Sequence, residues 1–198
     1  AWRMGGSKMF VEVGDQVSVE DLLRGVIVQS GNDACIVLAE TISGSEAAFS
    51  DLMTDKAGKL GLSNSTFRNA TGWPDPEHKM SVRDVALLTQ SIVTSFPEFL
   101  PLFSEKEFTY NGIRQGNRNP LLYKNIGVDG MKTGHTKEAG YSLAATATRN
   151  GRRLILVLTG LDTAQQRAVE GERLFDYGFR KFNNYTLFKD GETVDTAD

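Results

Sequence analysis

The order of helix and strand patterns along this chain predicts an α+β fold. Amphipathic helical patterns fill the first half, two antiparallel hairpin patterns follow, and one long amphipathic helix comes last. Strands that alternated with helices throughout would indicate a parallel βαβ sheet instead. We therefore expect an antiparallel sheet flanked by helices, within a length that suits one domain.

The first two helices are predicted on either side of a short break. Ser18 stands before two acidic residues and is suited to cap a helix. Ser30-Gly31 interrupts this helix, and a second one begins near Asn32 and closes at Gly44. The apolar residues at helical spacing in the first helix are Leu22, Leu23, Val26 and Ile27.

Two further helices are predicted by the same capping pattern. Ser45 begins a helix that Gly61 stops, and Ser81 begins another ahead of Val85. Residues 62–80 between them hold Asn, Gly and Pro clusters, which predict an irregular loop. The residues expected to point inward after Ser45 are Phe49, Leu52, Met53 and Leu60.

Two Asn-Gly pairs mark two β-hairpins. Asn111-Gly112 and Asn150-Gly151 each lie between two extended runs, and the second pair links residues 141–148 to 153–161. Asn and Gly tolerate the positive φ angles that a type I′ turn requires. The closing helix is expected over residues 164–182.

Composition excludes several classes of function. The net charge of −3 and the lack of a dense basic run give no sign of a nucleic-acid partner. Cys35 is the only cysteine, which excludes an internal disulfide and a Cys-based metal site, and its apolar helical surroundings favour a packed thiol. His78 and His135 are the only histidines, so no Ser-His-Asp triad or metal-ligand cluster is expected. His78 is expected in solvent.

Two short motifs about a hundred residues apart carry the main chemical signal. Ser30-Gly31-Asn32 lies at a helix break, and Lys132-Thr133-Gly134 lies on a strand. Each triplet alone is weak, because the first also suits helix capping and the second a turn with a solvated lysine. In this order they match two of the three motifs of active-site serine penicillin-recognising enzymes. Ser30 can relay a proton to a leaving group, and Asn32 can bond a lysine and a substrate peptide.

The second motif suits the wall of an acyl-transfer cleft. Lys132 supplies positive charge, and Thr133 supplies a hydroxyl donor for a substrate carboxylate. Gly134 carries no side chain where a substrate strand has to lie close. The backbone N–H of His135 can donate to a developing oxyanion.

Longer strings around these motifs carry a family resemblance. Residues 29–35, 105–115 and 128–136, with 139–141 and 177–180, closely resemble the D-alanyl-D-alanine carboxypeptidases of the penicillin-binding protein 5 and 6 type. The resemblance runs nearly end to end. It implies a β-lactamase/transpeptidase-like fold and a serine acyl-enzyme that removes the terminal D-alanine from peptidoglycan stem peptides. β-Lactams, which mimic that substrate, are the other implied ligands.

The resemblance also implies roles, a location and no cofactor. Arginine can bind a D-Ala carboxylate through two parallel hydrogen bonds, although a surface arginine paired with an acid remains the alternative for both arginines. The implied location is the periplasm of a bacterial cell envelope, at the inner membrane through a C-terminal anchor. The implied catalytic residues are Ser30, Asn32 and Lys132, and the implied substrate-binding residues are Thr133, Gly134, His135, Arg167 and Arg118.

The third family motif, a serine three residues before a lysine, does not occur in these 198 residues. The chain also starts at Ala1 without an initiator or a signal peptide. We therefore expect residues 1–186 to be a catalytic domain that lacks its start, and residues 187–198 to be a linker toward a β-rich domain. An upstream segment with Ser-Xaa-Xaa-Lys is an expected partner, without which the chain is inactive.

Two other functions stay open. The chain can be a binding module that keeps the carboxylate pocket without chemistry, or a relative of class A β-lactamases, which need a glutamate for deacylation. No glutamate between the motifs stands in a context that favours the latter. The enzyme interpretation requires the Ser30 hydroxyl and the Lys132 ammonium within roughly 2.6–3.5 Å, and Arg167 facing the same opening.

Overall fold

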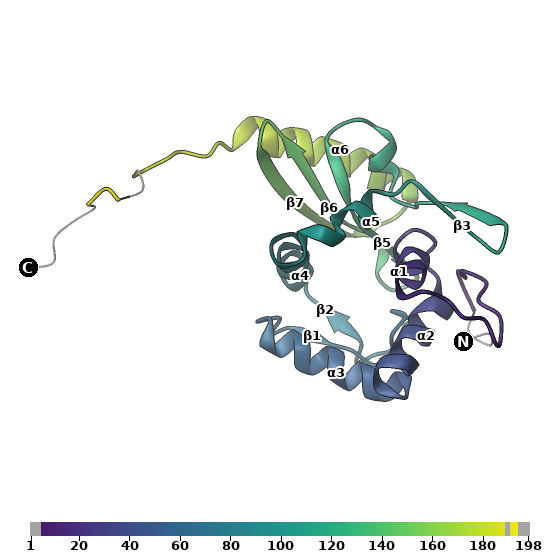
Figure 1. Ribbon diagram of the computed structural model, residues 1–198. Coiled ribbons are helices and arrows are strands. Elements are labelled where there is room, and N and C mark those ends of the chain that lie inside the picture. Colours follow the sequence, from purple (N-terminus) through teal and green to yellow (C-terminus); the bar gives the residue numbers. More distant parts are fainter. Residues whose placement is uncertain (1–4, 189–190, 194–198) are drawn as a thin grey trace, which may run out of the picture.

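One three-stranded antiparallel sheet organises the second half of the chain. The computed structural model describes residues 5–188 and 191–193. Strands β5 (Val128–Thr136), β6 (Gly140–Arg149) and β7 (Arg152–Leu161) lie in that order, and both neighbouring pairs are antiparallel (Figure 1). Strand β5 is therefore an edge strand of this sheet.

Helices cover the sheet on both sides. Helix α6 (Ala164–Lys181) packs against β6 and β7, and α4 (Val82–Ser95) packs against the same two strands from the other side (Figure 1). Helix α5 (Leu100–Ser104) packs against β5 and follows a single 3₁₀ turn, η1 (Pro97–Phe99). A second 3₁₀ turn, η2 (Pro120–Tyr123), contacts β5 and α6. The expected α+β layering is confirmed.

The first half of the chain forms a helical layer beside the sheet. Helices α1 (Val19–Ile27), α2 (Asn32–Ser43) and α3 (Glu46–Lys59) contact one another in chain order, and α1 also contacts α5. The loop after α3 is irregular as predicted, apart from one short antiparallel pair, β1 (Ser65–Thr66) with β2 (Lys79–Met80).

The predicted caps and turns are confirmed. The hydroxyl oxygens of Ser18, Ser45 and Ser81 each accept a hydrogen bond from the backbone N–H three residues later, at 3.0, 3.1 and 3.1 Å. Strands β3 (Glu107–Tyr110) and β4 (Ile113–Gly116) flank the first Asn-Gly turn. All four residues of the two Asn-Gly turns have φ between 47° and 75°.

Two of the four residues predicted to point inward from α3 (Glu46–Lys59) are exposed, while Phe49 and Met53 are half-buried. Leu52 and Leu60 on α3 are 46% and 36% exposed. Among the described elements α3 contacts α2 and β1, so only a narrow stripe of this helix is covered. Ser50 and Ala57 occupy that stripe and are buried instead.

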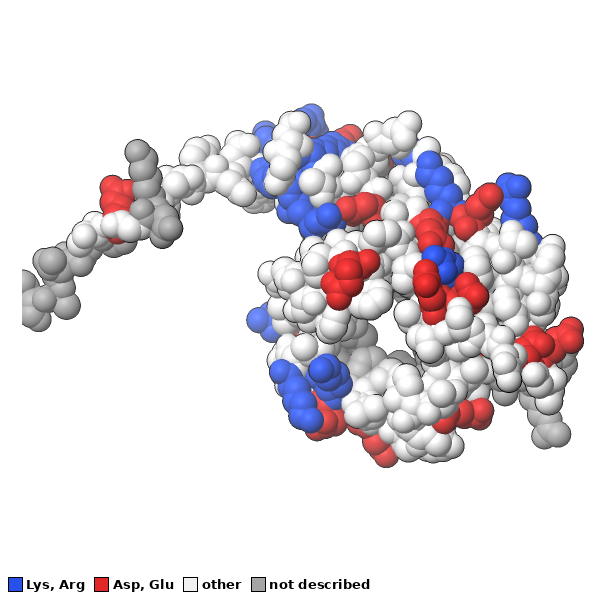
Figure 2. Space-filling model, viewed as in Figure 1, with Lys and Arg blue, Asp and Glu red and all other residues white. Residues whose placement is uncertain are grey.

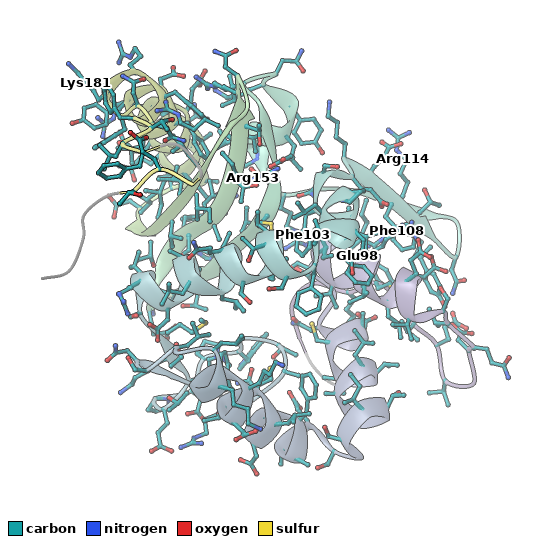
Figure 3. All side chains as sticks on the ribbon, turned by 60° about the vertical axis from the view of Figure 1, so that its left-hand side comes forward. Glu98, Phe103, Phe108, Arg114, Arg153 and Lys181 are labelled. Atoms are coloured by element: carbon teal, nitrogen blue, oxygen red, sulfur yellow. The ribbon has the colours of Figure 1, made fainter. Side chains whose placement is uncertain are left out.

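The core is divided into small clusters. The largest joins α6 to the sheet and consists of Leu121, Leu143, Ala145, Ala147 and Phe175. A second joins Met9 to Leu22 of α1 and Ala34 of α2. A third lies between α1 and α5, where Phe103 and Phe108 pack against its buried residues (Figure 3).

An ion pair holds the start of β5 in register with the rest of the sheet. Arg153 of β7, labelled in Figure 3, places its guanidinium nitrogen 2.7 Å from Oδ2 of Asp129 on β5. The Thr146 hydroxyl of the intervening strand β6 donates to Oδ1 of the same carboxylate. Since all three strands take part, the strand that carries Lys132 is fixed relative to its neighbours.

The described residues contain no single helix that is long and apolar enough to cross a membrane. One pair, Val82–Ser95 with Pro97–Ser104, is bent by 96° and meets the criteria of length and composition only. The expected linker over residues 187–198 lies mostly outside the described residues, and its assignment stays a prediction.

We expect Phe175→Ala to lower the free energy of unfolding by about 3–5 kcal/mol, because its ring is 1% exposed in the largest core cluster. Val169→Ala on the same helix is the control, since Val169 is 47% exposed and should change stability by less than about 0.5 kcal/mol. Urea unfolding of the two variants measures both values. Equal losses would contradict this location of the core.

Candidate active site

The first motif lies in a sharp break between α1 and α2. Ser30 has φ of 57°, a left-handed conformation that is uncommon for a residue with a side chain. Two backbone hydrogen bonds fix the break, from Gly31 N to Gly25 O at 2.9 Å and from Asn32 N to Ser7 O at 2.9 Å. Backbone strain of this kind concentrates at functional sites.

The second motif lies on the free edge of β5 and faces a cleft. Residues 132–136 line this cleft together with residues from α1, α2, α3 and the loop 67–78. Its volume is about 870 Å³, and Figure 2 shows the surface hollowed between α3 and α4. All eight residues that the sequence assigns to the site line this one cleft: Ser30, Asn32, Arg118, Lys132, Thr133, Gly134, His135 and Arg167.

The two motifs meet through a direct hydrogen bond. Nζ of Lys132 donates to Oγ of Ser30 at 3.0 Å, across 102 residues of sequence. The expected separation is confirmed. The same ammonium donates to the carbonyl oxygen of Thr133 at 2.9 Å, which holds the lysine side chain along its own strand.

The Lys132 ammonium lies in an environment that favours its neutral form. Burial, reinforced by the positive charges of Arg118 and Arg167, lowers the pKa of Lys132 to about 8. An amine with a pKa near 8 can accept and return a proton close to neutral pH. The Ser30–Lys132 pair is therefore suited to proton transfer as well as to charge stabilisation.

The two arginines differ in exposure. Arg167 is 8% exposed, and burial lowers its pKa. Its Nη2 donates to the carbonyl oxygen of Arg118 at 3.4 Å, while its buried Nε has no hydrogen-bond partner within the described part of the chain. Arg118 is exposed at the mouth of the cleft. Both guanidinium groups line the cleft and bring positive charge to it, which suits an anionic ligand.

The remaining strand residues are arranged for a ligand that lies along β5. A Cβ atom added to Gly134 would meet only Cβ of Ser142, at 3.6 Å, so internal packing does not require glycine here. The His135 ring contacts the Tyr141 ring in a tilted arrangement with a centroid distance of 4.1 Å, and Arg167 lies 5.7 Å from the centroid of the same Tyr141 ring. Tyr141 thus supports two of the predicted ligand-binding residues.

Three cleft residues were missed or placed differently by sequence reasoning. His78 is half-buried rather than solvated, contacts Phe67 edge to face, and has a pKa lowered by burial. Trp73 lines the cleft from a loop in which Oδ1 of Asn69 accepts four hydrogen bonds. Cys35 also lines the cleft, and burial raises the pKa of its thiol to about 11, which makes it a poor nucleophile at neutral pH.

Within residues 5–188 and 191–193, no group of three His, Cys, Asp or Glu side chains is placed to hold a metal ion. The polar groups of the cleft are instead hydroxyls, amides and cations. The cleft therefore presents binding groups for a peptide carboxylate beside a serine–lysine pair.

Comparison with known proteins agrees with this arrangement. The profile of a family described as D-alanyl-D-alanine carboxypeptidase matches residues 1–163. The chain belongs to this family. A D-alanyl-D-alanine carboxypeptidase of Escherichia coli, DacC, is 49% identical over 193 residues, which are 97% of this chain and 48% of the relative. The chain thus spans about half the length of this curated relative.

Solved structures of similar carboxypeptidases and penicillin-binding proteins share the fold. Penicillin binding protein 5 from Haemophilus influenzae is 48% identical with a TM-score of 0.86, over 88% of this chain and 52% of that protein. Penicillin-binding protein D2 from Listeria monocytogenes, in its ampicillin-bound form, is 32% identical with a TM-score of 0.80, over 89% of this chain and 74% of that protein. The predicted penicillin-recognising α+β fold is confirmed.

We expect Lys132 to titrate with a midpoint of about 8, measurable by NMR of labelled lysine side chains. Arg118→Gln should raise this midpoint because it removes a nearby positive charge. Arg114→Gln is the matched control, since Arg114 pairs with Glu107 on the β3–β4 hairpin. A midpoint near the ordinary lysine value of about 10.4 would contradict the buried environment.

The lowered pKa of Lys132 makes folding stability depend on pH. The pKa of Lys132 in the folded chain lies below its ordinary value, so the unfolded chain holds this proton over the interval between them. Between about pH 8 and the ordinary value of about 10.4, the contribution of Lys132 to folding stability should therefore rise with pH.

Proposed function

We propose that the full-length protein is a serine-type carboxypeptidase that removes the terminal D-alanine from peptidoglycan stem peptides. The observation that carries this proposal is the 3.0 Å hydrogen bond between Lys132 and Ser30, which joins the two family motifs in one cleft. Membership of the D-alanyl-D-alanine carboxypeptidase family supports the same reaction. The chemistry then follows from where the charges and donors lie.

The substrate carboxylate is recognised by the cationic end of the cleft. Arg167, Lys132 and Arg118 line the same opening and contribute positive charge to it. The Thr133 hydroxyl lies on the same edge of β5 and supplies a further donor. A free C-terminal carboxylate matches these groups in charge, which favours a carboxypeptidase over an enzyme that cuts within a chain.

The nucleophile is proposed to be the serine of a Ser-Xaa-Xaa-Lys segment that precedes residue 1 in the full-length protein. Its oxygen attacks the carbonyl carbon of the D-Ala–D-Ala bond, and the backbone N–H of His135 donates to the oxyanion. The proton that the attacking serine loses passes through Ser30 and Lys132 to the departing D-alanine amine as the C–N bond breaks. Asn32 orients the substrate peptide, and water then hydrolyses the ester and frees the serine.

β-Lactams are proposed as covalent ligands of the same serine. The relative from Listeria monocytogenes, which has an ampicillin-bound form, supports this part of the proposal. The site of action is proposed to be the periplasm, at the inner membrane through a C-terminal anchor, because that is where the peptidoglycan substrate is found. A binding module without chemistry is the alternative, motivated by the lack of Ser-Xaa-Xaa-Lys within residues 1–198.

A polypeptide of residues 1–198, prepared alone, should show no covalent uptake of a fluorescent penicillin and no D-alanine release. The reason is that no serine in it is followed three residues later by a lysine. A denaturing gel with fluorescence detection measures the label, and the full-length protein is the positive control. Stoichiometric labelling of the short polypeptide would mean that another residue, Ser30 first, is the nucleophile.

In the full-length protein, Lys132→Ala should lower the rate of D-alanine release by about 10²–10⁴-fold, because the variant lacks both the proton-transfer partner of Ser30 and a charge in the cleft. Lys59→Ala is the control, since Lys59 lies on α3 and pairs with Asp55 in solvent. Release of D-alanine from a D-Ala-D-Ala peptide is the measurement. An effect within a few-fold of the control would remove Lys132 from the mechanism, whereas a full-length wild type that binds but never releases D-alanine would favour the binding module.

A further inference from the structure

The carboxylate of Asp33, directly after the first motif, is buried and bonded to backbone only. Asp33 is 1% exposed. Each of its two carboxylate oxygens accepts two hydrogen bonds, four in all. Oδ1 accepts from Met9 N at 2.8 Å and Ala34 N at 3.0 Å, and Oδ2 accepts from Phe10 N at 2.8 Å and Val11 N at 3.1 Å. A buried carboxylate of this kind fixes the segment that supplies its donors.

The three consecutive donors impose a particular conformation on residues 9–11. Phe10 has φ of 72°, which is uncommon for a residue with a side chain. Met9 is fully buried against Leu22 and Ala34. Because one carboxylate collects three successive N–H groups, it compensates for the backbone strain at Phe10. The segment is thereby fixed onto α1 and the start of α2.

Residues 5–7, which lead directly into the fixed residues 9–11, hold Asn32 of the first motif. Two hydrogen bonds join them to Asn32. Ser7 O accepts from Asn32 N at 2.9 Å, and Gly5 O accepts from Asn32 Nδ2 at 2.9 Å. Gly6 lies against the same amide, because a Cβ atom added there would be 2.8 Å from Asn32 Nδ2. Gly6, Ser7 and Asn32 all line the cleft.

We propose that Asp33 is a positioning residue that sets the direction of the Asn32 amide through the segment 5–11. This inference rests on the proposed function, in which Asn32 orients the substrate peptide. Asp33 does not line the cleft, so it acts only through Asn32. The carboxylate-binding groups Lys132, Thr133 and Arg167 lie on other elements and do not depend on this segment. Loss of Asp33 should therefore impair turnover and spare substrate binding.

The first test is the Asp33→Asn variant of the full-length protein. An amide of the same shape places an NH₂ group against two backbone N–H donors in either orientation, so two of the four hydrogen bonds are lost. We expect kcat for D-alanine release to fall by about 10²-fold, the usual effect of misplacing a group by an ångström, with KM within about two-fold.

The matched control is Asp84→Ala, which loses two hydrogen bonds, the same number as Asp33→Asn. Asp84 is also a fully buried carboxylate that holds a loop, because it accepts from Asn64 N at 2.8 Å and Ser65 Oγ at 2.7 Å. It does not line the cleft. Its variant should lose thermal stability with kcat and KM nearly unchanged. If both variants change kcat alike at a similar loss of stability, Asp33 is merely structural and the proposal is overturned.

A second variant and a second readout cover the case in which Asp33→Asn does not fold. Gly6→Ala leaves the Asp33 carboxylate itself unchanged. The added Cβ would lie 2.8 Å from Asn32 Nδ2, at a backbone φ of 79° that disfavours a side chain, so the Asn32 amide should be displaced and kcat should fall similarly. NMR of the Asn32 side-chain amide in the full-length protein should show a changed shift and faster hydrogen exchange in both variants.

The outcomes separate this inference from the proposed function. An unchanged Asn32 amide in the variants, or a changed amide with normal kcat, would overturn the role of Asp33. A wild-type protein that releases no D-alanine would refute the proposed function. The amide shifts would then still decide whether Asp33 positions Asn32.

Discussion

The hydrogen bond between Lys132 and Ser30 is the contact on which the geometry of the site depends. It joins the edge strand of the sheet to the break between the first two helices. Each partner is held independently. The Asp129–Arg153 ion pair keeps β5 in register, and two backbone hydrogen bonds fix the break at Ser30. A shift in either element would separate a proton donor from its acceptor and leave the half-buried ammonium bonded to the Thr133 carbonyl alone among the described residues.

The cleft concentrates features that oppose stability. Ser30 has a left-handed backbone, Lys132 is a half-buried cation repelled by two arginines, and Arg167 has a buried donor without a partner in the described chain. Each of these is unfavourable for an isolated domain. Their location in one cleft indicates selection for binding or reaction there. The core clusters around Phe175 and Met9 supply the compensating stability.

Local sequence was enough to predict most of the helices and strands, and its motifs predicted which residues gather in one cleft. Ser18, Ser45 and Ser81 bond to their own helices, and the Asn-Gly turns need only their own φ angles, so neighbouring residues determine them. The two motifs predicted the meeting of Ser30 with Lys132 because they are the matching parts of a known constellation.

The exposure of individual side chains depends on tertiary packing and could not be predicted from local sequence patterns. Leu52 and Leu60 have helical periodicity, but exposure depends on which elements cover α3. His78 sits in a polar, Pro-bearing loop and is half-buried only because the loop folds onto Phe67. The role inferred for Asp33 depends on donors more than twenty residues away, which no local pattern indicates.

The free edge of β5 also bears on whether two copies of this protein can associate through their sheets. An unpaired strand edge is a template onto which another chain can add, and exposed edges of this kind promote aggregation. Here the edge that carries Lys132, Thr133 and Gly134 forms one wall of a cleft bounded by helices and by the loop 67–78. Such walls admit a short extended peptide more readily than the sheet of a second folded molecule. The same enclosure suits the proposed recognition of a chain terminus and disfavours sheet-to-sheet association.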